Sequence, residues 1–227
     1  MSDPLGNKPE DFLNKALKIS VGALPVVGGA LAELFNFAVA DPAQERRDDF
    51  FRETMARLVA LQSSHEQLSA EALRDNEQFQ ATMLQAARLA TSTASEEKRL
   101  LLQNAVLNSA IIRVDENLRQ IFLQTIESMT PFHVTLLDFL DNPKANPAAV
   151  KSAKDTYMGS MSHVIAAALP KVASDEELFR KLVGDLYRSG LTNRDSFSGV
   201  QSGGDSLLSR ATTKLGRGLL LFIRAPE

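Results

Sequence analysis

The side chains best suited to metal or acid–base chemistry begin with three histidines. His65, His133 and His163 lie far apart in the sequence. None of them has a histidine or carboxylate at both the three- and the four-residue spacing that would put metal ligands on one helix face. We therefore interpret the histidines as surface or half-buried helix residues rather than as ligands.

A second candidate is the group of carboxylates at residues 45–53. The acids are Glu45, Asp48, Asp49 and Glu53, and the interleaved bases are Arg46, Arg47, Arg52 and Arg57. Opposite charges three or four residues apart are typical of a solvated helix face with mixed ion pairs. We prefer this interpretation to a metal site, and the ferritin-type Glu-x-x-His pair is missing from the sequence.

The common catalytic and phosphate-binding motifs are also missing. The sequence has no G-x-S-x-G, no phosphate loop ending in Lys-Ser or Lys-Thr, and no G-x-G-x-x-G. It has no cysteine, which excludes disulfides, thiolate metal sites and cysteine nucleophiles. The sequence thus predicts a protein that is not an enzyme and holds no metal or cofactor.

Basic residues gather toward the C-terminus, which raises nucleic-acid binding as a possibility. From Arg180 to the end there are eight basic and four acidic residues, a net charge of +4. The candidate phosphate contacts are Arg180, Lys181, Lys214 and Arg217. The helix that would read DNA opens with three acids at 175–177, where such contacts normally begin. Nucleic acid is therefore the less favoured partner.

The composition is that of an ordinary soluble globular protein. The chain has 227 residues, of which 44% are hydrophobic and 23% charged, with a net charge of −3. Aromatic residues make up 6% and tryptophan is absent, which favours helices packed through leucine and alanine. We expect one compact domain or two small ones. The N-terminus lacks a secretory signal pattern, so we expect a cytoplasmic location.

The longest apolar run is Ile19–Ala40, which we call the leader. Pro25 and the pair Gly28–Gly29 interrupt it and predict a helical hairpin or a kinked helix. The run is long enough for a membrane span, but it contains Glu33 and Asn36, and a charged side chain at the bilayer centre costs about 2.5–3.5 kcal/mol. We favour a buried helix in a soluble bundle, then conditional membrane contact, and last a permanent span.

A long polar helix is predicted after the leader. Asp41 is a good cap and Pro42 suits the first helical position, and the pattern continues to about Ala90. The middle of this stretch has few apolar residues, which makes a break near Ser63–Ser64 plausible. Ser64, with Gln67 three residues later, would then cap a new helix.

Further helices follow, separated by short breaks. A break is predicted at Thr91–Ala94, a stop at Pro143, and one continuous helix from Pro147 to Leu169. The predicted helix starts are Ser95, Asp115, Thr130–Pro131, Asn146–Pro147 and Ser174.

The C-terminal part has the order of elements of a winged helix. Thr130–Asn142 serves as its first helix, and Gly190 suits the end of the recognition-type helix. A Gly/Ser-rich loop over 195–205 is followed by two extended pieces, Leu207–Thr212 and Leu219–Ile223. The prediction is a mostly α-helical protein with a helical bundle at 1–129 and a winged-helix-like domain with a short β-hairpin at 130–227.

Four segments together carry a family resemblance: LPVVGGALAELF, ERRDDFFRETMARL, EEKRLLLQNAVLNSAI and DLYRSGL with TTKLGRGLLLFI. They resemble uncharacterised bacterial helical proteins of the abortive-infection alpha type. The glycine-rich leader is also similar in style to HeLo-like "Bell" bundles, in which such an end is proposed to disrupt membranes. The resemblance implies a defence or stress effector without known catalytic residues.

Two functional hypotheses follow. In the first, the protein is a non-enzymatic interaction protein whose leader engages a membrane or a protein partner once released, with self-association as a further expectation. Val27, Leu31 and Leu34 would make the contacts, and Pro25, Gly28 and Gly29 would form the hinge. In the second, it is a DNA-binding regulator that acts through the winged helix.

Overall fold

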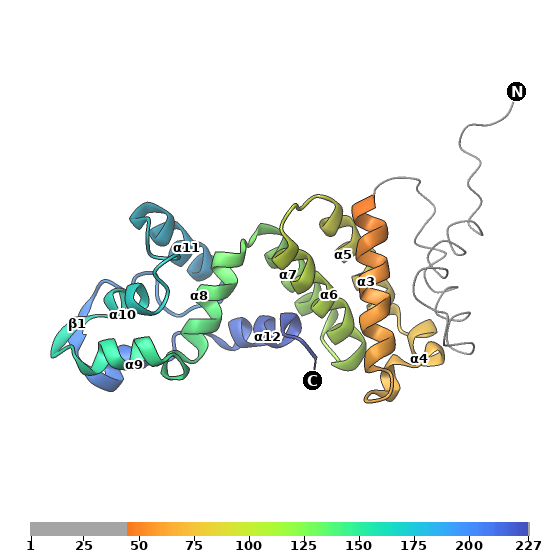
Figure 1. Cartoon of the computed structure of the whole chain (residues 1–227). Helices are drawn as coiled ribbons and strands as arrows, with labels where there is room; N and C mark the ends of the chain where they lie inside the picture. Colours follow the sequence, from red (N-terminus) through yellow and green to blue (C-terminus); the bar gives the residue numbers. More distant parts are fainter. Residues whose placement is uncertain (1–44, 227) are drawn as a thin grey trace, which may run out of the picture. The chain divides into compact units, whose positions relative to one another are not determined.

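The computed structural model describes residues 45–226, which form helices and one small two-stranded sheet (Figure 1). Contacts divide the chain into two compact units. Unit 1 contains the described residues up to Leu123 together with 225–226, and unit 2 contains Gln124–Arg224. The boundary falls inside one helix, whereas the sequence analysis placed it between Met129 and Thr130.

The leader lies outside the described residues. The predicted contact residues Val27, Leu31 and Leu34 and the hinge at Pro25, Gly28 and Gly29 are part of it.

Unit 1 is a set of helices around one whose second half is buried on all sides. Its central helix is α6, in which every residue from Leu102 to Ala110 is buried. Helices α3 and α5 pack on α6, and α5 makes the more extensive contact. The elements are α3 (Glu45–Leu61), η1 (Glu66–Leu68), α4 (Ala70–Arg74), α5 (Glu77–Thr91), α6 (Glu96–Ile111) and the start of α7 (Glu116–Ser128).

The predicted break in the long helix is confirmed, but its predicted cap is wrong. Helix α3 ends at Leu61, and the next turn, η1, begins after His65 rather than after Ser64. This single turn buries Leu68 completely. The chain then restarts at Ser69, whose hydroxyl accepts the amide of Ala72.

Several other helix starts agree with the sequence. The Ser95 side chain accepts the amide of Lys98 at 3.2 Å, and Asp115 accepts the amide of Leu118 at 3.3 Å. Asn146 accepts the amide of Ala149 at 3.1 Å. Pro131 opens its helix after Thr130. At Ser95, Asp115 and Asn146 a short polar side chain thus satisfies an amide that the first turn leaves without a helical partner.

Unit 2 combines short helices with the two-stranded sheet. Strands β1 and β2 are antiparallel, with Met158 opposite Ser202 and Ser160 opposite Val200. Helices α11 and α12 both pack on α8. The elements are α8 (Pro131–Asp141), η2 (Pro143–Ala145), α9 (Pro147–Lys154), β1 (Met158–Ser160), α10 (Met161–Ala168), α11 (Glu176–Arg188), β2 (Val200–Ser202), η3 (Gly204–Leu208) and α12 (Lys214–Ile223).

Three predictions for unit 2 are wrong. The continuous helix from Pro147 to Leu169 is interrupted by β1, because residues 158–160 pair with β2 instead of continuing the helix. Of the two predicted extended pieces, Leu219–Ile223 is helical and belongs to α12. The other piece, Leu207–Thr212, begins in η3 with Leu207 and Leu208, but Ser209 is extended and Thr212 forms an antiparallel bridge with Thr192, so this prediction is only partly wrong. The cap of α11 is Asp175 rather than Ser174, since its carboxylate accepts the amides of Glu177 and Leu178.

The end of α11 agrees with the sequence prediction. Gly190 follows the helix with a φ of 69°, a backbone conformation that favours glycine.

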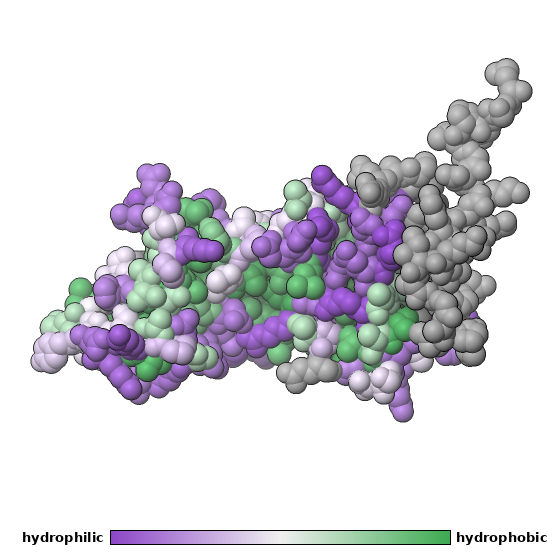
Figure 2. Space-filling model, viewed as in Figure 1, coloured by the Kyte–Doolittle hydropathy of each residue, from purple (hydrophilic) through white to green (hydrophobic). Residues whose placement is uncertain are grey.

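The fold class is mostly α, with one small antiparallel sheet among the described residues. Hydrophilic side chains cover much of α11 on the face shown in Figure 2. Within residues 45–226, no helix is both long and apolar enough to cross a membrane.

Candidate functional site

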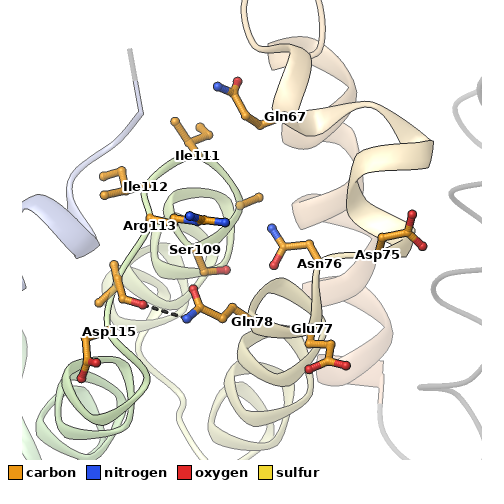
Figure 3. A pocket seen from close by; sticks show the side chains of 12 residues that line it. Gln67, Asp75, Asn76, Glu77, Gln78, Ser109, Ile111, Ile112, Arg113 and Asp115 are labelled. Atoms are coloured by element: carbon orange, nitrogen blue, oxygen red, sulfur yellow. Dashed lines mark hydrogen bonds between the residues drawn. The ribbon is translucent and has the colours of Figure 1, made fainter.

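A cleft of about 840 Å³ lies in unit 1, where the start of α5 faces the end of α6 (Figure 3). Its walls come from three stretches of the sequence. They are Gln67 of η1, residues 75–78 at the start of α5, and residues 109–115 at the end of α6 and in the linker to α7.

Local hydrogen bonds build the walls of the cleft. Asn76 caps α5, since its Oδ1 accepts the amide of Phe79 at 2.9 Å. The Nε2 of Gln78 donates to the carbonyl of Val114 at 2.8 Å and so fixes the α6–α7 linker against α5. At the end of α6, the amide of Ile112 donates a hydrogen bond to the carbonyl of Asn108 at 2.7 Å.

Both kinds of helix end meet at the cleft. The first turn of α5 presents backbone amides and a partial positive charge, whereas the last turn of α6 presents carbonyls and a partial negative charge. The start of one helix and the end of another therefore both line the cleft.

Arg113 is the basic residue among the described residues that line the cleft. Figure 3 shows its guanidinium reaching into the cleft on the side of Asn76. Within the described part of the chain, Arg113 makes no ion pair or hydrogen bond through its side chain. Its five donors are therefore available to an acidic group from outside.

Three carboxylates also line the cleft, but they point away from it. Figure 3 shows the side chains of Asp75, Glu77 and Asp115 directed outward. Asp115 caps α7 and accepts the amide of Asn117 at 3.0 Å. These acids leave the centre of the cleft to Arg113 and to the amides of Asn76 and Gln67, while Ile111 and Ile112 form an apolar side.

One member of the acidic group on α3, Glu53, belongs to a polar network that connects α3 with α6. Arg57 donates to Gln103 at 3.0 Å and to Asn104, and Gln103 donates to Glu53 at 2.7 Å. Burial lowers the pKa of Arg57. Within residues 46–226, no group of three or more His, Asp or Glu side chains could hold a metal ion.

Another acid of the same helix has a raised pKa. Burial is the main cause for Asp48, and the nearby guanidiniums of Arg47 and Arg52 oppose it. Asp49 and Arg52 form an ion pair at 2.5 Å, as expected for a mixed charged face.

His133 differs from the prediction for the histidines, because it is buried. Its Nδ1 accepts the amide of Thr130 at 3.0 Å, which satisfies the start of α8, and its Nε2 lies 3.4 Å from Asp185. His163 is exposed and His65 half-buried, as predicted.

The basic residues predicted to contact nucleic acid are divided between two helices. On α11, Lys181 pairs with Asp185 at 2.6 Å, and Arg180 lies 3.9 Å from Glu176. Lys214 and Arg217 belong to the first turns of α12, which adjoins the end of α11 because Thr213 donates to the carbonyl of Gly190 at 2.6 Å. Lys181 lies about 10 Å along the α11 axis before Arg188, the last residue of that helix.

Comparison of the chain with protein-family models, with curated proteins and with solved structures finds no match. The candidate site therefore stands on its geometry.

The sequence analysis considered Gln67 only as a capping partner of Ser64, and it did not single out Asn76 or Arg113. The available signal was local. Asn76 stands directly before a helical stretch as a capping residue, and Arg113 is a lone basic residue between a helix end and the cap of the next helix. Neither pattern indicates that the two residues meet across a cleft.

Proposed function

We propose that the protein is a non-enzymatic interaction protein whose unit 1 cleft binds a short peptide segment with an acidic group. The observation that carries this proposal is the guanidinium of Arg113, which reaches into the cleft without a partner among the described residues. Arginine binds carboxylates through two parallel hydrogen bonds, which gives geometric specificity as well as affinity.

The remaining lining supports a peptide rather than a free anion. The side-chain amides of Gln67 and Asn76 and the two helix ends provide donors and acceptors for a main chain, and Ile112 provides an apolar contact. The rim acids Asp75 and Glu77 would repel a segment with many carboxylates. The expected ligand therefore has one acidic group beside an apolar residue.

A random peptide library displayed on phage and selected against the full chain tests this function. We expect the selected peptides to share one acidic position next to an apolar residue. A synthetic peptide with that sequence should bind the Arg113→Gln variant at least about tenfold more weakly, because a charged hydrogen-bond partner has been removed.

Arg88→Gln is the matched control, because Arg88 is an exposed arginine of α5 that does not line the cleft. The Arg88→Gln variant should bind the peptide with the same affinity as the wild type. The proposal is wrong if no acidic motif is selected, or if the Arg113 and Arg88 variants bind the peptide equally well.

The leader extends this proposal toward an effector role. Its apolar sequence, broken by Pro25 and Gly28–Gly29, supports release from a cytoplasmic resting state and contact with a membrane or partner. Together with the resemblance to bacterial defence proteins, this supports a defence or stress effector. Liposome leakage by the full chain is the test, and a version lacking residues 1–41 that leaks equally well would reject the membrane contact.

A second candidate function is DNA binding by unit 2 as a winged helix. The order α10, turn, α11 and the isolated antiparallel bridge between Thr192 and Thr212 after α11 favour it. The ion pair of Lys181 with Asp185 speaks against it, since a phosphate would have to compete with that carboxylate. A gel shift over a salt series decides: no binding at low salt removes this candidate.

A further inference from the structure

The small sheet and the residue just before it carry three unusually exposed apolar side chains. Tyr157 is 90% exposed, Met158 65% and Val200 68%. Met158 is opposite Ser202 and Val200 is opposite Ser160, so Met158 and Val200 share one face of the sheet. We call Tyr157, Met158 and Val200 the apolar tip.

The apolar tip is held in place by backbone contacts. The amide of Gly203 donates to the carbonyl of Tyr157 at 2.8 Å. Gly203 also packs so closely on the carbonyl oxygen of Thr156 that a Cβ there would overlap it. The exposure of the tip is therefore part of a paired structure, and no residue of 156–160 or 199–203 is charged.

Three lysines lie on the two elements that precede the tip, Lys144 on η2 and the other two on α9. Lys144, Lys151 and Lys154 line a shallow pocket of about 380 Å³ beside α9. Lys154 is three residues from Tyr157, so their Cα atoms are no more than about 11 Å apart. In Figure 2 this end of unit 2, around β1 and α9, shows apolar and hydrophilic residues close together.

The charge balance of this end is positive. Lys144 pairs with Asp205 at 3.2 Å, and Asp155 lies on the pocket wall. Lys151 and Lys154 make no ion pair within the described residues. Two lysine ammonium groups next to an uncharged tip remain available to an anionic surface.

We propose that this end of unit 2 binds an anionic lipid bilayer, with the apolar tip in the headgroup region and Lys151 and Lys154 on lipid phosphates. Tyrosine favours the membrane–water interface, because its ring is apolar and its hydroxyl polar. Lysines beside the surface add attraction to anionic lipids. A nucleic acid fits less well, since the most protruding residues carry no charge for its phosphates. None of these residues belongs to the leader or lines the unit 1 cleft.

Because the chain has no tryptophan and only two tyrosines, each tyrosine can become a unique fluorescent reporter. The full-length Tyr157→Trp variant is mixed with vesicles of phosphatidylcholine, with and without phosphatidylglycerol. We expect a blue shift of its emission with the anionic vesicles. Tyr187→Trp is the matched control, since Tyr187 is exposed on α11, away from the tip, and we expect no shift for it.

Adding Lys151→Gln and Lys154→Gln to the reporter should weaken partition onto anionic vesicles at least about tenfold, because each basic residue near the surface contributes to the attraction. Lys171→Gln, which changes an exposed lysine outside this pocket, should leave it unchanged.

Three results would overturn the proposal. One is a Tyr157→Trp emission spectrum that does not shift with anionic vesicles. This result would overturn the proposal even if the protein bound the vesicles through the leader. Another is an equal shift of both reporters. The third is a shift with oligonucleotides but not with vesicles, which would assign the surface to nucleic acid. None of these results bears on peptide binding in the unit 1 cleft.

Discussion

Asp185 illustrates how one carboxylate can connect two helices of unit 2. Burial raises its pKa, but hydrogen bonds from Lys181, Arg188 and His133 lower the pKa by a larger amount. The result is a pKa of about 2, compared with the ordinary 3.8. Lys181 and Arg188 lie on its own helix, whereas His133 reaches it from α8. The charged form of Asp185 is therefore favoured in the folded state.

This lowered pKa predicts a contribution to stability that depends on pH. Because the folded pKa lies below the unfolded one, the contribution is complete above about pH 4 and is lost as pH falls toward 2. It amounts to at most about 2 kcal/mol. Asp185→Asn should be less stable than the wild type at neutral pH, and the difference should shrink between pH 4 and 2. Urea unfolding at a series of pH values measures it; a difference that does not depend on pH would contradict the assignment.

At the scale of residues, the candidate site was largely unpredictable from the sequence. The capping role of Asn76 could be inferred from its neighbours, because capping is a local interaction. The meeting of Asn76 with Gln67 and Arg113 depends on how α5 and α6 pack, which no local pattern encodes. Arg113 alone resembles any exposed basic residue.

Among the elements, α12 depends on close backbone packing. A Cβ on Gly216 would overlap the carbonyl oxygen of Leu191, and that carbonyl already accepts the amide of Thr213 at 2.9 Å. Gly216→Ala should therefore force α12 away from the end of α11. We expect a loss of about 1–3 kcal/mol in the free energy of unfolding, measured by urea denaturation.

Gly184→Ala is a suitable comparison, because Gly184 is also a helical glycine. The nearest atom to its added Cβ is the guanidinium Nη2 of Arg188, the end of a flexible side chain, at 3.9 Å. Alanine is the better helix former, so this variant should gain up to about 1 kcal/mol. If both variants lose stability equally, the close contact at Gly216 is not the cause.

At the scale of elements, the sequence predicted what is local and failed where pairing is distant. Helix starts at Ser95, Asp115 and Asn146 follow from capping chemistry within three residues. Strand β1 forms by pairing with β2, which lies far along the chain. Because the local sequence does not show this pairing, residues 158–160 were predicted as part of a continuous helix.

The misassignment of Leu219–Ile223 has another cause. A short apolar run fits a buried strand or a buried helix equally well. In the structure Leu221 is exposed while its neighbours on both sides are buried, which is the pattern of one outward position on a helix.

For the whole molecule, the important feature is that each unit has a core of its own. In unit 1, Leu102 and Leu107 of α6 are completely buried, and in unit 2 the same holds for Leu136 and Leu140 of α8. Cooperative unfolding follows shared buried contacts, so separate cores favour separate unfolding units. A single melting temperature would then describe the chain poorly.

This organisation predicts that core substitutions act within one unit. Leu107→Ala and Leu136→Ala each remove a buried side chain and should cost about 2–5 kcal/mol. By hydrogen–deuterium exchange, Leu107→Ala should expose amides of α3, α5 and α6, and Leu136→Ala those of α8, α11 and α12. Helix α7 is not diagnostic, because the boundary passes through it. In the double variant the two sets of changes should add, since independent sites do not couple. If either single substitution raises exchange equally in both units, the chain unfolds as one cooperative body, and the division into two units describes only its contacts.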